Sequence, residues 1–122
     1  MEYLAIGLVL LVAVEHIYIL VLEMFLWTKP RTLRVFGMTA QLAESSKVLA
    51  ANQGLYNGFL AAGLFWGLSH SNSQLGFEIQ AFFLSCILLA AMYGGLTVKK
   101  SILMVQGIPA LLALCSVMWV HG

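Results

Sequence analysis

The sequence predicts an all-α, polytopic membrane protein, namely a bundle of four transmembrane helices with an interfacial helix in the first cytoplasmic loop. Hydrophobic residues make up 61% of the 122 residues and charged residues only 9%, whereas a soluble domain carries about 25% charged residues to wet its surface. Four apolar windows each approach about 20 residues, the length that crosses ~30 Å of hydrocarbon. All six Lys and Arg residues fall in two connecting segments. No change in composition divides the chain, so residues 1–122 are expected to form a single transmembrane domain.

The four spans are expected at residues 3–27, 48–68, 77–98 and 102–120. The three tryptophans lie near span ends, where amphipathic rings favour the headgroup region. The first apolar run has no positive segment before it and no small-residue cleavage site after it, so we expect a retained helix rather than a signal peptide. Pro30 is expected to end the first span, because proline lacks the N–H that a helix interior requires.

The basic residues orient these spans. The tail before the first span, the loop at residues 69–76 and the end after the fourth span contain no Lys or Arg. The positive-inside rule therefore places the two basic connections in the cytoplasm and both termini on the non-cytoplasmic side of the cell membrane, in a multi-pass protein. The basic residues are Lys29, Arg31, Arg34 and Lys47 in the first connection, and Lys99 and Lys100 in the last turn.

The first connection is longer than a turn requires. Apolar residues such as Leu33, Phe36 and Leu42 alternate in it with polar residues such as Arg34 and Glu44. This mixture is typical of an amphipathic helix that lies in the membrane interface, although an ordinary cytosolic loop would have a similar composition.

Small residues recur every four positions in the second and third spans. Helices in lipid associate through close backbone contact over such residues. Because a short loop joins the two spans, we expect these residues to form the contact of a tight helical hairpin. They are Gly54, Gly58 and Ala62 in the second span, and Cys86, Ala90 and Gly94 in the third.

Three ionisable side chains lie inside the first span, where each costs about 2.5–3.5 kcal/mol on insertion scales. Glu15 and His16 lie about 17–18 Å from the cytoplasmic end of the span, and Glu23 about 6 Å from it. At 100° per residue the three share a sector of about 100°. A carboxyl and an imidazole in one sector can exchange protons with a substrate, so Glu15, His16 and Glu23 are the candidate catalytic residues.

Further polar side chains lie in the expected cytoplasmic half of the other spans. Together with the acidic residues they predict a polar pocket that opens toward the cytoplasm, and they are the candidate ligand-binding residues. The alternative is that the amides only bond helices together, and that Glu23 pairs with Lys47 or Arg31. The candidates are Asn52, Gln53, Tyr56, Asn57, Tyr93 and Gln106.

These features predict a protein that binds a small amphipathic or lipid-derived ligand, with proton transfer or isomerisation as the chemistry if it is an enzyme. No nucleophile, metal-ligand set or nucleotide loop is visible, so no metal and no cofactor are expected. The net charge of +1 does not indicate a basic surface that would bind nucleic acid.

Cys86 and Cys115 lie in apolar runs and are expected to be buried thiols. Membrane lipid and a second copy of the chain are the expected partners. The alternatives are an accessory subunit of a membrane complex and an oligomeric transporter.

Several segments carry a resemblance to a known family. The stretch 22–31 (LEMFLWTKPR), the tripeptide 35–37 (VFG), the run 47–61 (KVLAANQGLYNGFLA) and the stretch 106–110 (QGIPA) resemble the DUF1304 family of small four-helix bacterial membrane proteins. The resemblance covers nearly the whole chain and implies a four-helix membrane fold. It leaves the activity open, because the family has no assigned function. Its motifs coincide with the polar positions named above.

Overall fold

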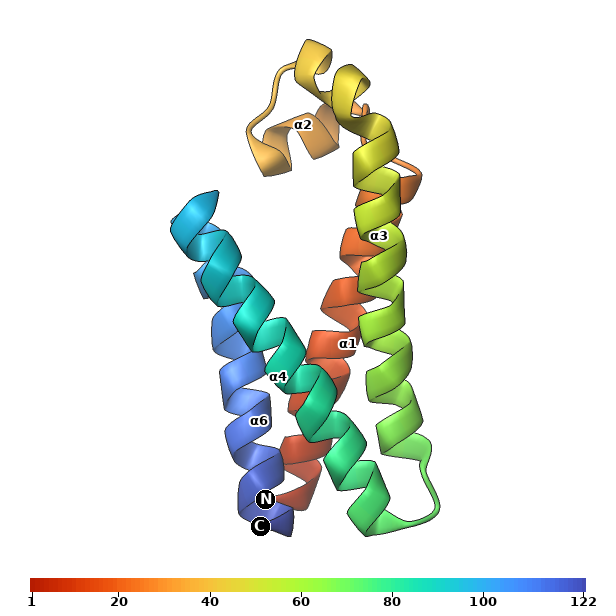
Figure 1. Ribbon diagram of the computed structural model, residues 1–122, viewed down its shortest axis with the longest axis vertical. Helices are drawn as coiled ribbons and strands as arrows, with labels where there is room; N and C mark the ends of the chain where they lie inside the picture. The colour runs from red at the N-terminus through yellow and green to blue at the C-terminus, as the bar shows by residue number, and fades with distance from the viewer. The chain divides into compact units, whose positions relative to one another are not determined.

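The computed structural model describes residues 1–122 and contains helices and no strands, so the predicted all-α class is confirmed. Figure 1 shows the helices in chain order. They are α1 (Glu2–Met24), α2 (Pro30–Phe36), α3 (Ala40–Ser69), α4 (Ser73–Thr97), α5 (Lys100–Ile102), the π-helical turn η1 (Leu103–Gly107) and α6 (Ile108–His121).

Three helical segments are long and apolar enough to cross a membrane: α1, α4 and the run Lys100–His121. The chain is therefore a helical, membrane-associated protein. Helix α3 is the longest, with 30 residues, but it is not among the three. The amides that it carries at Asn52, Gln53 and Asn57 lower its hydropathy.

The first connection contains a helix, α2, as the sequence predicts, and its last residues, 40–47, belong to α3. Helix α3 begins at Ala40, eight residues before the expected start at 48 (48 − 40 = 8). Thr39 caps it, because its Oγ1 accepts a hydrogen bond of 3.1 Å from the backbone N–H of Leu42. The expectation that Pro30 ends the first span was wrong. Helix α1 already ends at Met24, and Pro30 is the first residue of α2, where its missing N–H has no helical acceptor to lose.

Helix α2 is closed by a left-handed glycine. Gly37 has a φ of 64° and donates its N–H to the carbonyl of Leu33, and the N–H of Met38 donates to the same oxygen at 3.0 Å. The Met38 bond is the one found in a Schellman motif and the Gly37 bond the one found in an αL motif, and together they satisfy a carbonyl at the helix end and turn the chain toward α3.

The chain divides into two compact units, which we describe separately. Residues Met1–Val14 and Leu60–Gly122 form the first, and residues Glu15–Phe59 form the second. Helices α1 and α3 each contribute to both units.

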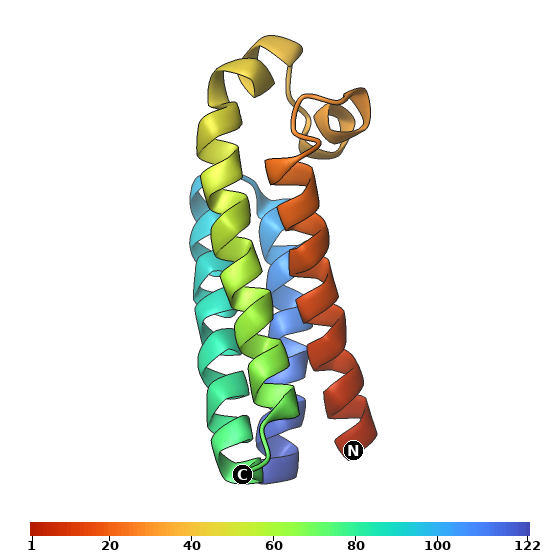
Figure 2. The ribbon, with the colours of Figure 1, turned by 90° about the vertical axis from the view of Figure 1, so that its right-hand side faces the viewer.

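The core of the first unit is apolar. Its fully buried side chains include Val9, Leu64, Leu84, Ile87 and Val117. Helices α4 and α6 run side by side (Figure 2), and the two chain termini lie at the same end of this unit (Figure 1).

A π-helical turn precedes α6. The N–H of Ile108 donates to the carbonyl of Leu103, five residues back, and Pro109 follows with no N–H to donate. The wider turn thus accommodates the missing donor of Pro109 at the start of α6. A Cβ on Gly107 would lie 3.3 Å from the Cβ of Ala91, so α4 approaches the backbone of this turn closely.

In the second unit, the end of α1 packs against the middle of α3. A Cβ on Gly54 would meet Met24 Cγ at 2.7 Å, and one on Gly58 would meet Leu20 Cδ1 at 2.6 Å. The predicted role of these glycines, contact with the third span, was therefore wrong. Spacing along α3 identified a close-packing face but not its partner.

Other small residues make the contacts between α3 and α4. A Cβ on Gly63 would collide with the ring of Phe83, and one on Gly67 would meet Gln80 Cγ at 2.7 Å. Gly94, which was expected to face the second span, instead faces Ile102, because a Cβ on Gly94 would lie 3.1 Å from Ile102 Cγ2.

Candidate functional site

A hydrogen bond joins two of the predicted site residues in the second unit. Glu23 lies in the last turn of α1, and Asn57 lies in α3 beside the glycine face. The Nδ2 of Asn57 donates to Oε1 of Glu23 at 2.6 Å, across 34 residues of sequence. Both side chains are half-buried. The alternative prediction, that Glu23 pairs with Lys47 or Arg31, was wrong, because the amide of Asn57 takes this place.

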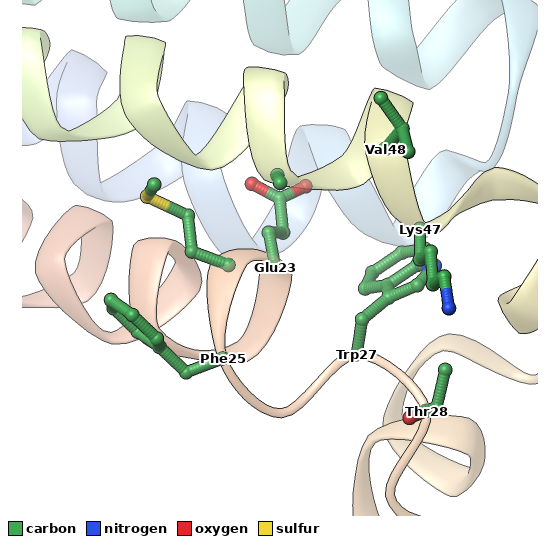
Figure 3. Close-up of a pocket in the computed structure, with 8 residues that line it drawn as sticks. Glu23, Phe25, Trp27, Thr28, Lys47 and Val48 are labelled. Atoms are coloured by element: carbon green, nitrogen blue, oxygen red, sulfur yellow. The ribbon is translucent and has the colours of Figure 1, made fainter.

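A pocket of about 370 Å³ opens beside Glu23 (Figure 3). The carboxylate points from the end of α1 toward the ribbon of α3, and Trp27 lies between Glu23 and Lys47 in this view. The walls combine apolar side chains with a few polar groups. They are Glu23, Met24, Phe25, Trp27, Thr28, Lys47, Val48 and Ala51.

Contacts with two helices hold Trp27 in the pocket wall. Its indole Nε1 donates to Ser46 Oγ at 3.2 Å, and its ring centroid lies 5.0 Å from that of Phe36 in α2. Ser46 in turn donates to the carbonyl of Leu42 at 2.6 Å. The indole therefore connects the chain after α1 to both α2 and α3.

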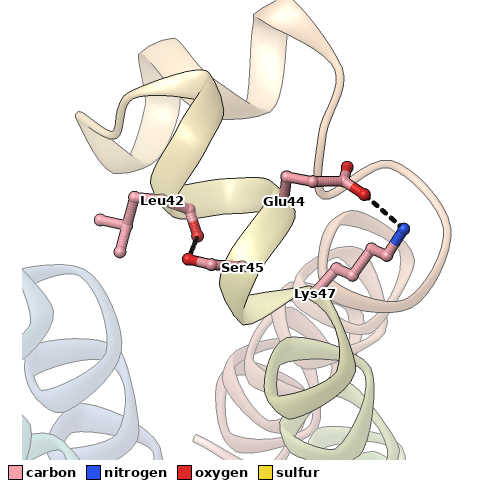
Figure 4. Close-up of polar contacts among 4 residues, drawn as sticks. All are labelled: Leu42, Glu44, Ser45 and Lys47. Atoms are coloured by element: carbon pink, nitrogen blue, oxygen red, sulfur yellow. Dashed lines mark hydrogen bonds and ion pairs between the residues drawn. The ribbon is translucent and has the colours of Figure 1, made fainter.

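Lys47 lies at the pocket and forms an exposed ion pair. Its Nζ lies 2.6 Å from Oε1 of Glu44 (Figure 4), and the two side chains are 55% and 62% exposed. In the same turn Ser45 donates to the carbonyl of Leu42 at 3.0 Å. An exposed ion pair contributes about 0–1 kcal/mol, so Lys47 can exchange Glu44 for a ligand group at small cost.

Glu15 and His16 precede Glu23 in α1 and belong to the same unit, but they do not line the pocket. His16 is 1% exposed. Glu15 is half-buried, and its Oε1 is buried without a hydrogen-bond partner.

The other candidates lie outside the pocket. Asn52, Gln53 and Tyr56 are exposed on α3, and the Tyr56 ring packs edge-on against Phe59 at 5.9 Å. Tyr93, 72% exposed, and Gln106, half-buried in the π-helical turn, belong to the first unit. Of the nine predicted site residues, Glu23 alone lines this pocket.

Sequence reasoning missed most of the pocket lining because it consists of apolar residues at a span end. Every membrane helix has such residues, so they do not indicate a site. Trp27, the last residue of the expected first span, and Thr28 directly after it were the available signal, because both lie next to basic residues. No group of three or more His, Cys, Asp or Glu side chains is placed to hold a metal ion.

Comparisons with known proteins agree over nearly the whole chain. The family model described as "Protein of unknown function (DUF1304)" matches residues 10–118. The chain is also 45% identical over 118 residues to the uncharacterized protein YpaA of Lactococcus lactis subsp. lactis (strain IL1403), covering 95% of this chain and 98% of the relative. No solved structure matches. With a helical membrane-type fold and a family match over this length, the chain belongs to the DUF1304 family.

Proposed function

We propose that this protein binds a small amphipathic or lipid-derived molecule in the pocket at the end of α1, with Glu23 as its polar anchor. The observation that carries the proposal is the half-buried carboxylate of Glu23 beside a pocket of about 370 Å³. Such a volume lies at the low end of small-molecule sites, which are typically apolar with a few placed polar groups.

The lining suits a molecule with an apolar body and a polar head. Met24, Phe25 and Val48 offer apolar surface. Glu23 has one carboxylate oxygen in use with Asn57, and a carboxylate has about four acceptor positions. A hydroxyl or amine of the ligand would donate to the remaining ones. Thr28 and Lys47 would hold a second polar or anionic group.

The position of the pocket also fits a ligand that comes from the bilayer. It lies where α1, a helix that can span the membrane, ends. We propose a four-span topology in which α3 is the remaining span and the pocket faces the cytoplasmic leaflet. The support is the distribution of the six basic residues and the 30-residue length of α3, about 45 Å at 1.5 Å per residue.

If the protein is an enzyme, we propose that Glu23 accepts or donates the proton at the bound molecule, as in an isomerase. Glu15 and His16, deeper in α1, would exchange protons with the site.

A second candidate is a structural or accessory subunit of a membrane complex. The hydrogen bond between Asn57 and Glu23 favours it, because such a bond joins two helices whether or not a ligand is present.

Glu23→Gln separates the two candidates. A glutamine keeps a side-chain oxygen that can accept from Asn57, but it removes the charge that strengthens a hydrogen bond to a ligand. Ala51→Phe fills the pocket, and Leu55→Phe places the same aromatic side chain at an exposed position of α3 that does not line it. Native mass spectrometry of each variant, purified from its own membranes in mild detergent, measures the co-purified molecule.

We expect wild type and Leu55→Phe to retain the same amphiphile, Ala51→Phe to lose it, and Glu23→Gln to retain about tenfold less, since a charged hydrogen bond contributes about 1.5–3 kcal/mol. Thermal unfolding of each variant checks that the fold is kept. Equal retention in all four proteins, or none in any, would contradict the binding function and support the structural role.

A further inference from the structure

A second pocket, of about 140 Å³, lies in the first unit at the end that holds both chain termini. Residues at the starts of α1 and α4 and at the ends of α3 and α6 form it. Its polar lining residues are Glu2, His70, Ser73, Gln80 and His121, and the rest of the lining is aliphatic or glycine. Since helix ends surround it, a water-soluble molecule can reach it. The volume accommodates several waters or a molecule of a few heavy atoms.

Gln80 distinguishes this pocket from an ordinary surface depression. Its side chain is only 8% exposed and lines the pocket, yet no protein group forms a hydrogen bond with its amide. Its amide oxygen and nitrogen are not among the enclosed side-chain atoms that lack a partner, so they are accessible from the pocket. A polar occupant of the pocket can therefore bond this amide.

His70 supplies a defined hydrogen-bond donor. Its Nδ1 accepts the backbone N–H of Asn72 at 3.0 Å, so this nitrogen carries no proton and Nε2 carries the ring N–H. This N–H remains available to an acceptor in the pocket.

The start of α4 adds further donors. Asn72 caps the helix by accepting the N–H of Leu75 through its side chain and that of Gly76 through its carbonyl. The N–H groups of Ser73 and Gln74 have no acceptor within the helix, and the positive end of the helix dipole lies here. Ser73 and Gly76 line the pocket, so its α4 side favours a negative group.

The opposite charge is also present, because the carboxylate of Glu2 lines the same pocket. His121, the remaining titratable residue in the lining, is stacked on Phe77 with 5.3 Å between ring centroids. A simple anion would be repelled by Glu2, and a simple cation would leave the donors of α4, His70 and Gln80 unused.

We propose that this pocket binds a small zwitterion of amino-acid size. The carboxylate of the ligand accepts from His70 Nε2–H, the Gln80 amide and the start of α4, and its ammonium pairs with Glu2. The site is separate from the pocket at Glu23, and its test is independent of the function proposed there.

Glycine, together with acetate and methylammonium, which each carry one of its two charged groups, tests the proposal as a ligand of the full-length protein in nanodiscs. Saturation-transfer NMR measures the binding of each probe. We expect glycine to bind about tenfold or more tightly than acetate or methylammonium, because only glycine engages both charged sides of the pocket.

Three variants locate the effect. Gln80→Leu removes the amide at nearly constant volume and should abolish glycine binding while the thermal stability is kept. Glu2→Gln should raise acetate binding relative to glycine. Glu78→Gln is the matched control, because Glu78 is exposed on α4 and does not line the pocket.

Acetate binding equal to glycine binding in the wild type would overturn the proposal in favour of an anion site. Glycine binding that persists in Gln80→Leu, or that is absent from the wild type, would also overturn it.

Discussion

Glu15 has a carboxylate oxygen, Oε1, that is buried and accepts no hydrogen bond, and the hydroxyl of Thr32 is in the same condition. Glu23, eight residues after Glu15 on α1 (23 − 15 = 8), instead has the Asn57 amide as a partner at 2.6 Å. Of these two acidic residues in one apolar helix, only Glu23 therefore has a hydrogen bond that offsets the cost of its burial. An uncompensated ionisable group inside a membrane helix is a common sign of function, because stability alone does not favour it.

Replacing Glu15 by leucine should stabilise the protein. The change removes a buried oxygen without a partner, whose cost is about 1–3 kcal/mol, and places an apolar side chain in an apolar helix. We expect the free energy of unfolding in mixed detergent micelles to rise by about that amount. Val14→Leu, a change at the exposed neighbouring residue, should leave it nearly unchanged. A marked loss of stability in Glu15→Leu would show that the carboxyl has a structural partner.

Glu23→Leu should have the opposite effect. It removes the acceptor of Asn57 Nδ2 and leaves a half-buried amide donor unpaired, which costs about 1–3 kcal/mol. The same unfolding measurement checks the sign. The double variant Glu23→Leu with Asn57→Leu should recover part of the loss, because neither partner then remains unpaired.

At the scale of helices, the sequence predicts that a helix is present better than it predicts where the helix begins and which other helix it packs against. Apolar windows located α1, α4 and the run Lys100–His121 to within a few residues. The start of α3 was missed because residues 40–47 are polar and helical at once, and a hydropathy window does not detect a polar helix. The Gly54 and Gly58 spacing predicted close packing correctly, but spacing on one helix contains no information about which helix lies opposite.

The two glycines should respond differently to alanine. At Gly54 a Cβ would lie 2.7 Å from Met24 Cγ and 3.2 Å from the backbone oxygen of Leu20, whereas at Gly58 it would meet only the side chain of Leu20, chiefly its terminal Cδ1. Backbone cannot move as easily as the end of a side chain. We therefore expect Gly54→Ala to lower the free energy of unfolding by about 1–3 kcal/mol and Gly58→Ala by less.

Gly7→Ala is the control for this pair, since a Cβ at Gly7 meets nothing within 4 Å. It should be neutral or stabilising by up to about 1 kcal/mol, because alanine favours the helix. If Gly58→Ala were the more damaging change, the packing of α1 on α3 described above would be wrong.

For the molecule as a whole, composition and charge carry most of the predictive information. A chain with 9% charged residues cannot wet a globular surface, so membrane association follows from simple counting. The candidate site is less accessible to such reasoning. Glu23 and Asn57 could be selected because polar groups are costly in a span, but Met24, Val48 and Ala51 acquire their role only when the helices pack.

The orientation in the membrane provides the last prediction. With both basic connections in the cytoplasm, Ser71 lies outside and Ser45 inside, and both are exposed in the structure. In a background with Cys86 and Cys115 replaced by alanine, Ser71→Cys should react with a membrane-impermeant maleimide on intact cells. Ser45→Cys should react only after the membrane is opened, and its labelling then serves as the control for accessibility. Labelling of Ser45→Cys alone on intact cells would invert the topology and place the Glu23 pocket on the outer leaflet. Labelling of both would mean that α3 does not cross the membrane, because Ser45 lies near the start of α3, Ser71 follows its end, and no other helix lies between them.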